Sequence, residues 1–381
     1  MSWREIELGD AIHVKHGFAF KGEHFSDNGT HIVLTPGNFN EQGGFRLRPG
    51  KDRFYASDIP QDFILSQGDL IIAMTEQGPG LLGSSALIPQ DDRFLHNQRL
   101  GLVEICDKTV LDREYLYHLF NTKNVRAQIS GSASGTKVRH TAPERIYRVK
   151  VRIPPNVSEQ RRIAQVLSAY GDLIENNRRR IRLLEEAARL LYREWFVRLR
   201  FPGHEHVAVV GGVPEGWGRV TLGRVAPLKY GKALKEDDRV PGPYPVYGSS
   251  GVVGTHESAL VAGPGIIVGR KGNVGSVYWS DNDFCPIDTV YYIEAENASL
   301  YLYYVLLHTN FISTDVAVPG LNRNYAHGRE VLIANPALMQ EFESVVAPIH
   351  AQIAVLRRYN KQVSKARDLL LPKLMNGEVQ V

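Results

Sequence analysis

The chain has 381 residues, of which 43% are hydrophobic, 9% aromatic and 23% charged. This length fits two ordinary domains with residues left over, and this composition excludes a mainly disordered chain, a collagen-like fibre and a disulfide-stapled secreted module. The net charge is only +4, from 45 basic and 41 acidic residues, so the total charge does not by itself indicate a nucleic-acid partner.

Two features predict the compartment. The cysteines, Cys106 and Cys285, lie far apart and have no metal-ligand spacing, which indicates a reducing environment. The amino-terminal MSWREIELGD has no apolar signal-peptide core, and no apolar run reaches about 18 residues. We therefore expect a cytoplasmic protein without membrane association.

The chain repeats itself along its length. The segment WREIELG from Trp3 recurs as WGRVTLG from Trp217. Four further pairs follow in the same order: GDLIIAMTEQG from Gly68 with GPGIIVGRKGN from Gly263, REYLYHLFNT from Arg113 with SLYLYYVLLHT from Ser299, GSASGTKVRH from Gly131 with AVPGLNRNY from Ala317, and VRIPP from Val151 with LIANP from Leu332. Because five correspondences keep one order, we predict two similar domains.

Each domain is predicted to be α/β (α+β) and rich in strands. The short apolar runs HIVLT, DLIIAM and LGLVEI, and later GIIVG, SVYW and TVYYIEA, are separated by Gly, Pro and Asn turns, which is typical of strands. YLYHLF and YLYYVLL predict one helix near the end of each domain. We place the domains at residues 1–155 and 217–336, joined through a Gly- and Pro-rich linker at residues 201–216.

A long helix is predicted after each domain, at residues 156–200 and 337–378. Apolar residues recur there at steps of three and four. The first series is Ile163, Val166, Leu167, Tyr170, Leu173, Ile174, Ile181, Leu184, Ala188, Leu191 and Trp195. The second series is Phe342, Val345, Val346, Ile349, Ile353, Leu356, Val363, Ala366, Leu370 and Leu374. Each apolar stripe needs a partner, and the other helix is the obvious candidate. Asn177 and Asn360 interrupt the stripes, either to fix register or to face solvent.

No motif in the sequence indicates catalysis. GPGLLG from Gly78 matches the dinucleotide pattern G-x-G-x-x-G, but Pro89 follows too soon for the required helix, which favours a turn. GRKGNVG from Gly269 lacks the Walker spacing, and NPAL from Asn335 lacks the second proline and the aromatic residue of an amino-methyltransferase motif. The histidines and cysteines form no metal-binding pattern, and no serine lies in a G-x-S-x-G turn.

The charge distribution is more informative than the total. Residues 158–200 contain ten Arg and six acids, and residues 338–376 contain six basic and three acidic residues. The remaining sequence has 29 basic and 32 acidic residues, so the basic excess lies on the predicted helices. Within the domains, basic residues cluster in loops with Gly, Asn, Ser and Tyr. Arg, Lys, Asn and Gln are the residue types that read base edges, while Lys, Ser and backbone amides also hold phosphates.

These features together resemble the specificity subunit of Type I restriction–modification systems. The resemblance rests on the W-x-x-(V/I)-x-L-G openings at Trp3 and Trp217, on the entry IP-P-x-x-x-Q-x-x-I-A from Ile153 to Ala164, and on the helix LIENNRRRIRLLEEAARLLYREWF with its counterpart ending LLLPKLMNGEV. It covers essentially the whole chain. The second helix entry, ANPALMQEFESVVAPI, departs from it because it lacks Q-x-x-I-A and contains Pro348, so the start of that helix is open.

The resemblance implies a non-catalytic subunit that selects a DNA sequence. Each domain would be a target-recognition domain that reads one half of a bipartite site, and the two helices would form an antiparallel coiled coil between them. Two methyltransferase subunits would supply the S-adenosylmethionine chemistry. Restriction subunits with ATP- and Mg-dependent translocase and nuclease activity would join them, and this chain would bind no cofactor itself. Forty helical residues span roughly 60 Å, more than one turn of B-DNA at about 34 Å. Because the domains differ, we expect an asymmetric target.

The candidate DNA-contacting residues lie in the polar loops. In the first domain they are Thr75, Gln77, Asn97, Gln98, Arg99, Lys137, Arg139 and His140. In the second they are Lys229, Tyr230, Lys232, Ser249, Ser250, Arg270, Lys271, Asn273, Asn322, Arg323 and Asn324. The helix residues Arg178, Arg179, Arg180 and Arg182 are expected to face partner subunits or flanking phosphates. Three alternatives stay open: a coiled-coil scaffold that does not bind DNA, the detached recognition chain of a fused restriction–methyltransferase enzyme, and an enzyme with a novel site.

Overall fold

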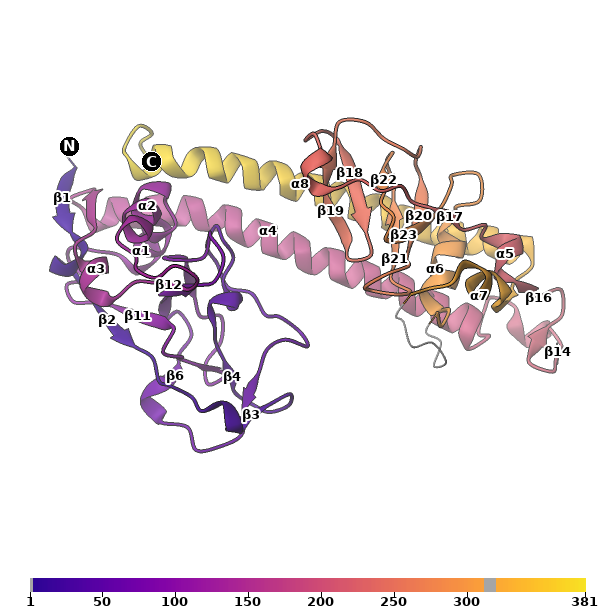
Figure 1. Cartoon of the computed structure of the whole chain (residues 1–381), viewed down its shortest axis with the longest axis horizontal. Coiled ribbons are helices and arrows are strands. Elements are labelled where there is room, and N and C mark those ends of the chain that lie inside the picture. The colour runs from indigo at the N-terminus through magenta and orange to yellow at the C-terminus, as the bar shows by residue number, and fades with distance from the viewer. Residues whose placement is uncertain (1–2, 312–319) are drawn as a thin grey trace. The chain divides into compact units, whose positions relative to one another are not determined.

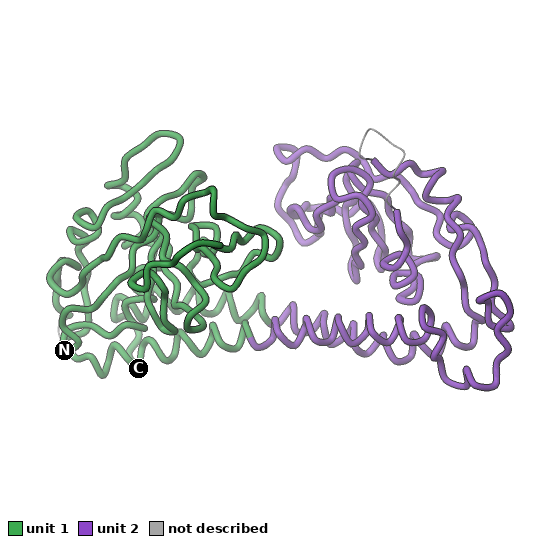
Figure 2. Tube along the Cα trace, turned by 90° about the horizontal axis from the view of Figure 1, so that it is seen from below, with its two compact units in different colours: residues 1–175, 360–381 green, residues 176–359 purple. Residues whose placement is uncertain are grey.

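The computed structural model describes residues 3–311 and 320–381. The chain forms two compact units, which we describe separately: unit 1 comprises residues 1–175 and 360–381, and unit 2 comprises residues 176–359 (Figures 1 and 2). Residues 317–319 of the predicted repeat lie outside the described residues. No helix in the described part of the chain is long and apolar enough to cross a membrane.

Unit 1 contains two main sheets. The four-stranded sheet is antiparallel throughout, in the order β2 (Ile12–His16), β11 (Leu100–Ile105), β7 (Leu70–Ala73), β9 (Ser85–Leu87). The five-stranded sheet has the order β3 (Phe25–Ser26), β5 (Phe54–Tyr55), β4 (Ile32–Val33), β10 (Phe94–Leu95), β6 (Ile64–Leu65). Its β4–β10 pair is parallel. All four residues of β7 are buried, because this central strand is covered on both faces.

Unit 2 repeats this topology. Its four-stranded antiparallel sheet has the order β17 (Lys229–Tyr230), β23 (Val290–Ile293), β20 (Gly265–Gly269), β21 (Val277–Ser280). Its smaller sheet has the order β19 (Gly251–His256), β18 (Tyr244–Gly248), β22 (Cys285–Pro286), and the β18–β22 pair is again parallel. The strands fall where the apolar runs predict them, and the predicted duplication is confirmed.

Shorter elements complete each unit. In each domain, a strand near the beginning pairs antiparallel with a strand near the end. These pairs are β1 (Arg4–Glu7) with β13 (Lys150–Ile153), and β16 (Gly218–Thr221) with β24 (Glu330–Ile333). The remaining strands form two short pairs, β8 (Thr75–Glu76) with β12 (Arg139–His140), and β14 (Val209–Val210) with β15 (Val213–Pro214) in the predicted linker. The short helices are α1 (Arg113–Phe120), α2 (Lys123–Gly131), α3 (Pro143–Tyr147), α5 (Leu222–Val225), α6 (Leu300–His308) and α7 (Arg323–Gly328). Helices α1 and α6 are the predicted aromatic ones.

The repeated Leu-Gly pair anchors the strand that follows it. A Cβ at Gly9 would lie 2.6 Å from Cβ of Tyr147, and one at Gly223 would lie 2.9 Å from Cβ of His327, so only glycine fits at either position. In each unit, the side chain packed against the glycine accepts a hydrogen bond from a backbone amide. Tyr147 Oη accepts from the amide of Val14 at 3.0 Å, and His327 Nε2 accepts from the amide of Leu228 at 3.0 Å. The motif therefore positions β2 and β17 in the same way.

The long helices are α4 (Val157–Tyr192), which continues as a π-helical turn at Arg193–Val197, and α8 (Pro336–Met375). Within unit 1, Asn360 Nδ2 donates to the Ile174 carbonyl at 3.3 Å. Within unit 2, Arg357 bonds Glu185 at 2.6 Å, and Phe342 contacts Tyr192 and Trp195. In unit 2, the contacts advance along α4 while they go back along α8, so the two helices run antiparallel there.

The predicted apolar stripes are correct with two exceptions. Every predicted position on α4 is buried or half-buried, and Asn177 is buried among them. On α8, Val345 is 45% exposed and Ala366 is also exposed, so both were wrongly assigned to the stripe. Val346 and Val363, which were assigned to the same stripe, are buried as predicted. A three-or-four-residue step fits both Val345 and its neighbour Val346, and only the packing decides which of the two is buried.

The second helix begins at Pro336, with Asn335 Oδ1 accepting from the Leu338 amide at 2.9 Å, and continues through Pro348. Although α8 lacks the Q-x-x-I-A pattern, a different side chain makes a similar contact there. In α4, buried Gln160 accepts from the Asp112 amide at 3.0 Å, which ties the helix to the start of α1. In α8, Glu343 accepts from the Tyr301 amide in α6 at 2.8 Å. The domain limits predicted at residues 155, 200, 216 and 336 stay predictions.

Candidate nucleic-acid interface

A glycine after the first strand of each four-stranded sheet lets two backbone segments approach closely. A Cβ at Gly17 would lie 2.1 Å from the Asn97 carbonyl oxygen, and one at Gly231 would lie 2.0 Å from the Ile287 carbonyl oxygen. The residue after each glycine donates from its amide in the same way, Phe18 to His96 at 2.8 Å and Lys232 to Pro286 at 3.0 Å. The backbone therefore has the same arrangement in the two units where these loops begin, and we call this shared arrangement the backbone frame.

A second match lies at the end of the central strand. The amide of Met74 donates to the Arg99 carbonyl at 3.0 Å, and that of Arg270 donates to the Thr289 carbonyl at 2.9 Å. The Met74 carbonyl accepts from Thr141 at 2.9 Å, and the Arg270 carbonyl accepts from Leu321 at 2.8 Å. Met74 and Arg270 thus occupy equivalent positions, and the units differ there by a full positive charge.

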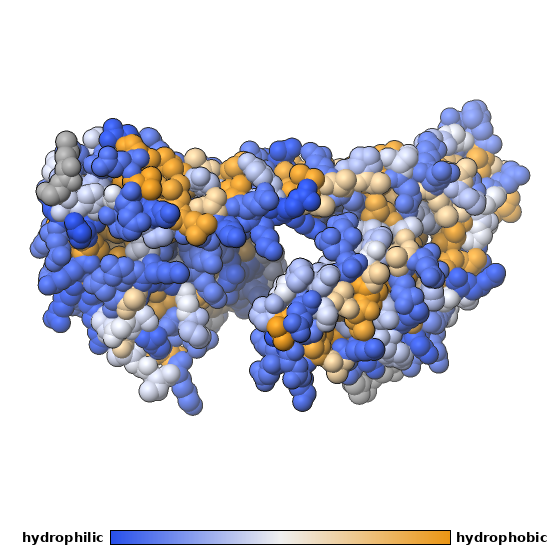
Figure 3. All heavy atoms as spheres, turned by 90° about the horizontal axis from the view of Figure 1, so that it is seen from above, coloured by the Kyte–Doolittle hydropathy of each residue, from blue (hydrophilic) through white to orange (hydrophobic). Residues whose placement is uncertain are grey.

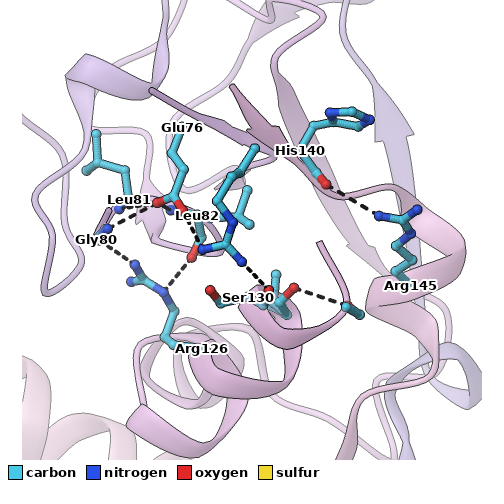
Figure 4. Close-up of polar contacts among 11 residues, drawn as sticks. Glu76, Gly80, Leu81, Leu82, Arg126, Ser130, His140 and Arg145 are labelled. Atoms are coloured by element: carbon cyan, nitrogen blue, oxygen red, sulfur yellow. Dashed lines mark hydrogen bonds and ion pairs between the residues drawn. The ribbon is translucent and has the colours of Figure 1, made fainter. Parts of the chain in front are cut away.

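In unit 1, the structure brings Thr75, Arg139 and His140 together. Strands β8 and β12 place Thr75 opposite His140 and Glu76 opposite Arg139. Arg139 pairs with Glu76 at 3.2 Å and also donates to the Ser130 carbonyl (Figure 4). The Arg139 guanidinium is therefore held by this chain's own groups.

Buried Glu76 closes the GPGLLG loop. Its Oε2 accepts from the amides of Gly80, Leu81 and Leu82 at 3.1, 3.0 and 2.9 Å (Figure 4). From the other side, Arg126 donates to the carbonyls of Gly80 and Leu82 at 2.6 and 2.7 Å, and burial lowers its pKa. The amides that would bind a phosphate are occupied by a carboxylate, and strand β9 follows rather than a helix, so the predicted turn is confirmed.

No hydrogen bond or ion pair between described residues joins the side chains of the other unit 1 candidates to this network. Asn97 is buried, and its Oδ1 accepts from the Arg99 amide at 3.1 Å, whereas Gln98 and Arg99 are exposed. Gln77 and Lys137 are exposed.

The sequence analysis did not identify a cluster of basic and aromatic residues beside Asn97. Lys15 Nζ lies 5.0 Å from the Phe63 ring centroid, next to exposed His16 and to Phe18, which is 37% exposed. The Lys-x-Gly pattern at Lys15 repeats at Lys229, 214 residues later, and was the available signal.

In unit 2, three predicted residues gather around one aromatic ring. The ring of Tyr230 is 46% exposed. The guanidinium carbon of Arg270 lies 5.0 Å from its centroid, and that of Arg323 lies 4.9 Å from it. The ring of Tyr291 meets Tyr230 edge-on at 5.0 Å. Strand β17, the end of β20 and the start of α7 thus converge on this position.

The other unit 2 candidates surround these three. Lys229 pairs with Glu294, whose carboxylate raises the pKa of the lysine, and Lys271 pairs with Asp288 at 3.8 Å. Asn273 Nδ2 donates to Ser250 Oγ at 3.2 Å, and the Asn273 amide donates to buried Ser249 at 3.4 Å.

The last unit 2 candidates lie at the start of α7 and after β17. Asn322 caps α7 by accepting from the amides of Asn324 and Tyr325 at 2.8 and 3.1 Å. Lys232 and Asn324 are exposed.

The helix surface in unit 2 carries both charged and apolar side chains. Arg178, Arg179, Arg180 and Arg182 are all exposed on α4. Leu183 and Leu190 lie seven residues apart on α4 and are 61% and 44% exposed, and Val197 in the π-helical turn that follows is 56% exposed. On the face drawn in Figure 3, apolar side chains reach the surface as separate patches among polar ones. A heptad-spaced apolar stripe that faces solvent is typical of a contact surface.

Comparison with known proteins identifies the family. Residues 1–186 and 214–322 match the model of the Type I restriction modification DNA specificity domain. The chain is 25% identical over 317 residues to the Type I restriction enzyme MjaIX specificity subunit of Methanocaldococcus jannaschii, covering 74% of this chain and 72% of that protein. It is 23% identical to the putative type I restriction enzyme MjaX specificity subunit of the same organism, with 86% and 83% covered.

A solved structure has the same fold. The crystal structure of a Type I restriction–modification S subunit from M. genitalium superimposes with a TM-score of 0.61 at 18% identity, covering 98% of this chain and 96% of that one.

Proposed function

Because this chain belongs to the Type I restriction–modification DNA specificity family, we propose that it recognises an asymmetric bipartite target in double-stranded DNA. Unit 1 carries the loops for one half of the target, and unit 2 carries the loops for the other. The chain itself performs no catalysis.

One observation carries this proposal: the same backbone frame presents different side chains in the two units. Gly17 and Gly231 set the same close backbone approach, and Met74 and Arg270 end the same central strand. A duplicated frame suits a ligand with two similarly built halves, such as a duplex. Different residues on that frame suit two different base sequences.

The reaction chemistry would belong to partner subunits. Two methyltransferase subunits would bind S-adenosylmethionine, and restriction subunits would bind ATP and Mg²⁺. The helices α4 and α8, with 36 and 40 residues, are the segments that would set the spacing between the half-sites. A rigid pair of helices suits this task because a fixed half-site spacing requires a stiff connection.

The methyltransferase contact is proposed on α4. The exposed Leu183 and Leu190 of α4, with Val197 in the turn that follows, would bury apolar area against the partner, and the neighbouring arginines 178–180 and 182 would add charge contacts. Such a surface has an apolar centre and a charged rim, as many protein interfaces do.

The test is co-production of the full chain with the methyltransferase subunit of its own system, followed by selection from a randomised duplex library. We expect a stable complex that enriches one motif with two separated, non-identical halves. Enrichment of a single contiguous motif would rule out the bipartite proposal. A complex that binds all duplexes equally would rule out sequence recognition.

A further inference from the structure

Unit 2 presents an exposed tyrosine between two arginines. Their guanidinium carbons lie 5.0 Å and 4.9 Å from the Tyr230 centroid, within the range of cation–π contact. We call Tyr230, Arg270 and Arg323 the dual-arginine cluster. Two positive charges held on one small ring repel each other, and this arrangement favours a ligand that supplies electron-rich atoms.

The acidic side chains around the cluster are engaged elsewhere. Asp288 pairs with Lys271 at 3.8 Å, and Glu294 pairs with Lys229. Within residues 3–311 and 320–381, neither Arg270 nor Arg323 forms an ion pair. Both guanidinium groups therefore keep hydrogen-bond donors for an external acceptor.

The two arginines differ in how firmly they are held. Arg270 Nη1 donates to the Asp288 carbonyl at 3.1 Å, and its guanidinium also lies 5.8 Å from the Tyr291 ring centroid. The backbone of Arg270 is held by two hydrogen bonds, from its amide to the Thr289 carbonyl and from the Leu321 amide to its carbonyl. A guanidinium with a fixed plane suits bidentate recognition of the O6 and N7 atoms of guanine. Among residues 3–311 and 320–381, the Arg323 side chain forms no hydrogen bond and its guanidinium lies over the Tyr230 ring. This looser attachment suits a phosphate, which requires charge rather than a fixed plane.

Residues 3–175 and 360–381 of unit 1 contain no such cluster. His16 occupies the position of Tyr230, one residue before the tightly packed glycine, and Met74 occupies the position of Arg270. Pro143, the first residue of α3, occupies the position of Arg323, the first residue of α7.

We propose that Arg270, held against Tyr230, reads a guanine in the half-site bound by unit 2, and that Arg323 contacts a flanking phosphate. Unit 1 makes no equivalent contact. This inference rests on the proposed DNA recognition and assigns its residues and one of its bases.

The test repeats the duplex selection with the complex that contains Arg270→Met. Methionine is the residue that unit 1 carries at this position, so the backbone frame accommodates it. We expect one half of the motif to lose its preference at a single G·C pair, with discrimination against other bases falling about 5- to 150-fold. Replacing that guanine by 7-deazaguanine, which lacks N7, should weaken the wild type but not the variant.

Two further variants separate the roles. Arg323→Ala should weaken binding to all duplexes and reduce the salt slope of log K by about one, with the motif unchanged. Arg329→Met is the matched control, because it removes a guanidinium from above another tyrosine in the same unit, 5.7 Å from the Tyr325 centroid. It should leave the motif and the affinity unchanged.

The outcomes are distinguishable. If the wild type selects a motif and Arg270→Met selects the same motif with equal discrimination, the assignment of Arg270 is wrong while DNA recognition stands. If the relaxed position is not a G·C pair, the guanine assignment is wrong. If the wild type selects no motif, the proposed function itself fails.

Discussion

Glu76 shows how a single buried carboxylate shapes a candidate recognition loop. It accepts three backbone amides and one arginine. Substituting Glu76→Ala leaves those donors without a partner, and we expect a loss of about 2–4 kcal/mol in the free energy of unfolding. Urea denaturation of the full chain measures this loss. Lys137→Ala, at an exposed position, is the control and should change little. Equal stability of Glu76→Ala and wild type would contradict the structural role given to Glu76.

Two buried histidines predict how unit 1 responds to pH. Burial lowers the pKa of His96 to about 4 and that of His118 to about 4, against 6.5 in the unfolded chain. Between pH 6.5 and 4 the unfolded chain binds protons that the folded chain does not, so stability falls as pH falls. Each histidine lowers the free energy of unfolding by up to about 1.4 kcal/mol for each pH unit of this fall.

The comparison of wild type with His118→Gln tests this pH dependence. The variant should have a shallower fall of unfolding free energy across pH 6.5 to 4, measured by urea denaturation at several pH values. The same slope in both proteins would show that His118 does not titrate as its burial requires.

The sequence alone does not show which groups of the chain a candidate residue contacts. Arg139 was predicted to read bases, and the structure places its guanidinium on Glu76, 63 residues earlier in the chain. Arg126 was not predicted at all, although it holds the loop carbonyls from α2. Both contacts join segments far apart in sequence, and no local pattern encodes such a pair. Tyr230, Arg270 and Arg323 were each predicted, but their convergence depends on the sheet.

At the scale of elements, local periodicity was sufficient for the longer ones. Helices α4 and α8 and the buried strand β7 were predicted because they are long or uniformly apolar. The strands β5 and β10 were not predicted, because each has two residues and two residues show no periodicity. The error at Val345 has a related cause, since the adjacent Val346 fits the same helical step and is the buried one.

The exposed stripe on α4 gives a prediction for partner binding. Leu183→Glu places a charge in the proposed apolar contact, and we expect co-purification with the methyltransferase to be lost while the chain stays folded. Leu369→Glu is the matched control, because Leu369 on α8 is 60% exposed, against 61% for Leu183. Circular dichroism reports the fold of both variants. Retention of the partner by Leu183→Glu, or equal loss in the control, would exclude the stripe as the contact.

At the scale of the whole molecule, the net charge of +4 is the sum of two regions with opposite net charge. The predicted helix segments carry the basic excess, while the remainder is slightly acidic. We therefore expect the two domains to bind DNA through local basic groups such as the dual-arginine cluster rather than through an overall positive surface. The duplication gives two copies of one frame, and the side chains on each copy differ.

The most direct test of bipartite recognition is a methylation map of genomic DNA from cells that contain this chain and its methyltransferase subunit, read base by base. The account predicts one motif with two different half-sites, separated by a fixed number of unspecified base pairs, and its loss when this chain is removed. A palindromic or contiguous motif, or a motif that persists without this chain, would contradict it.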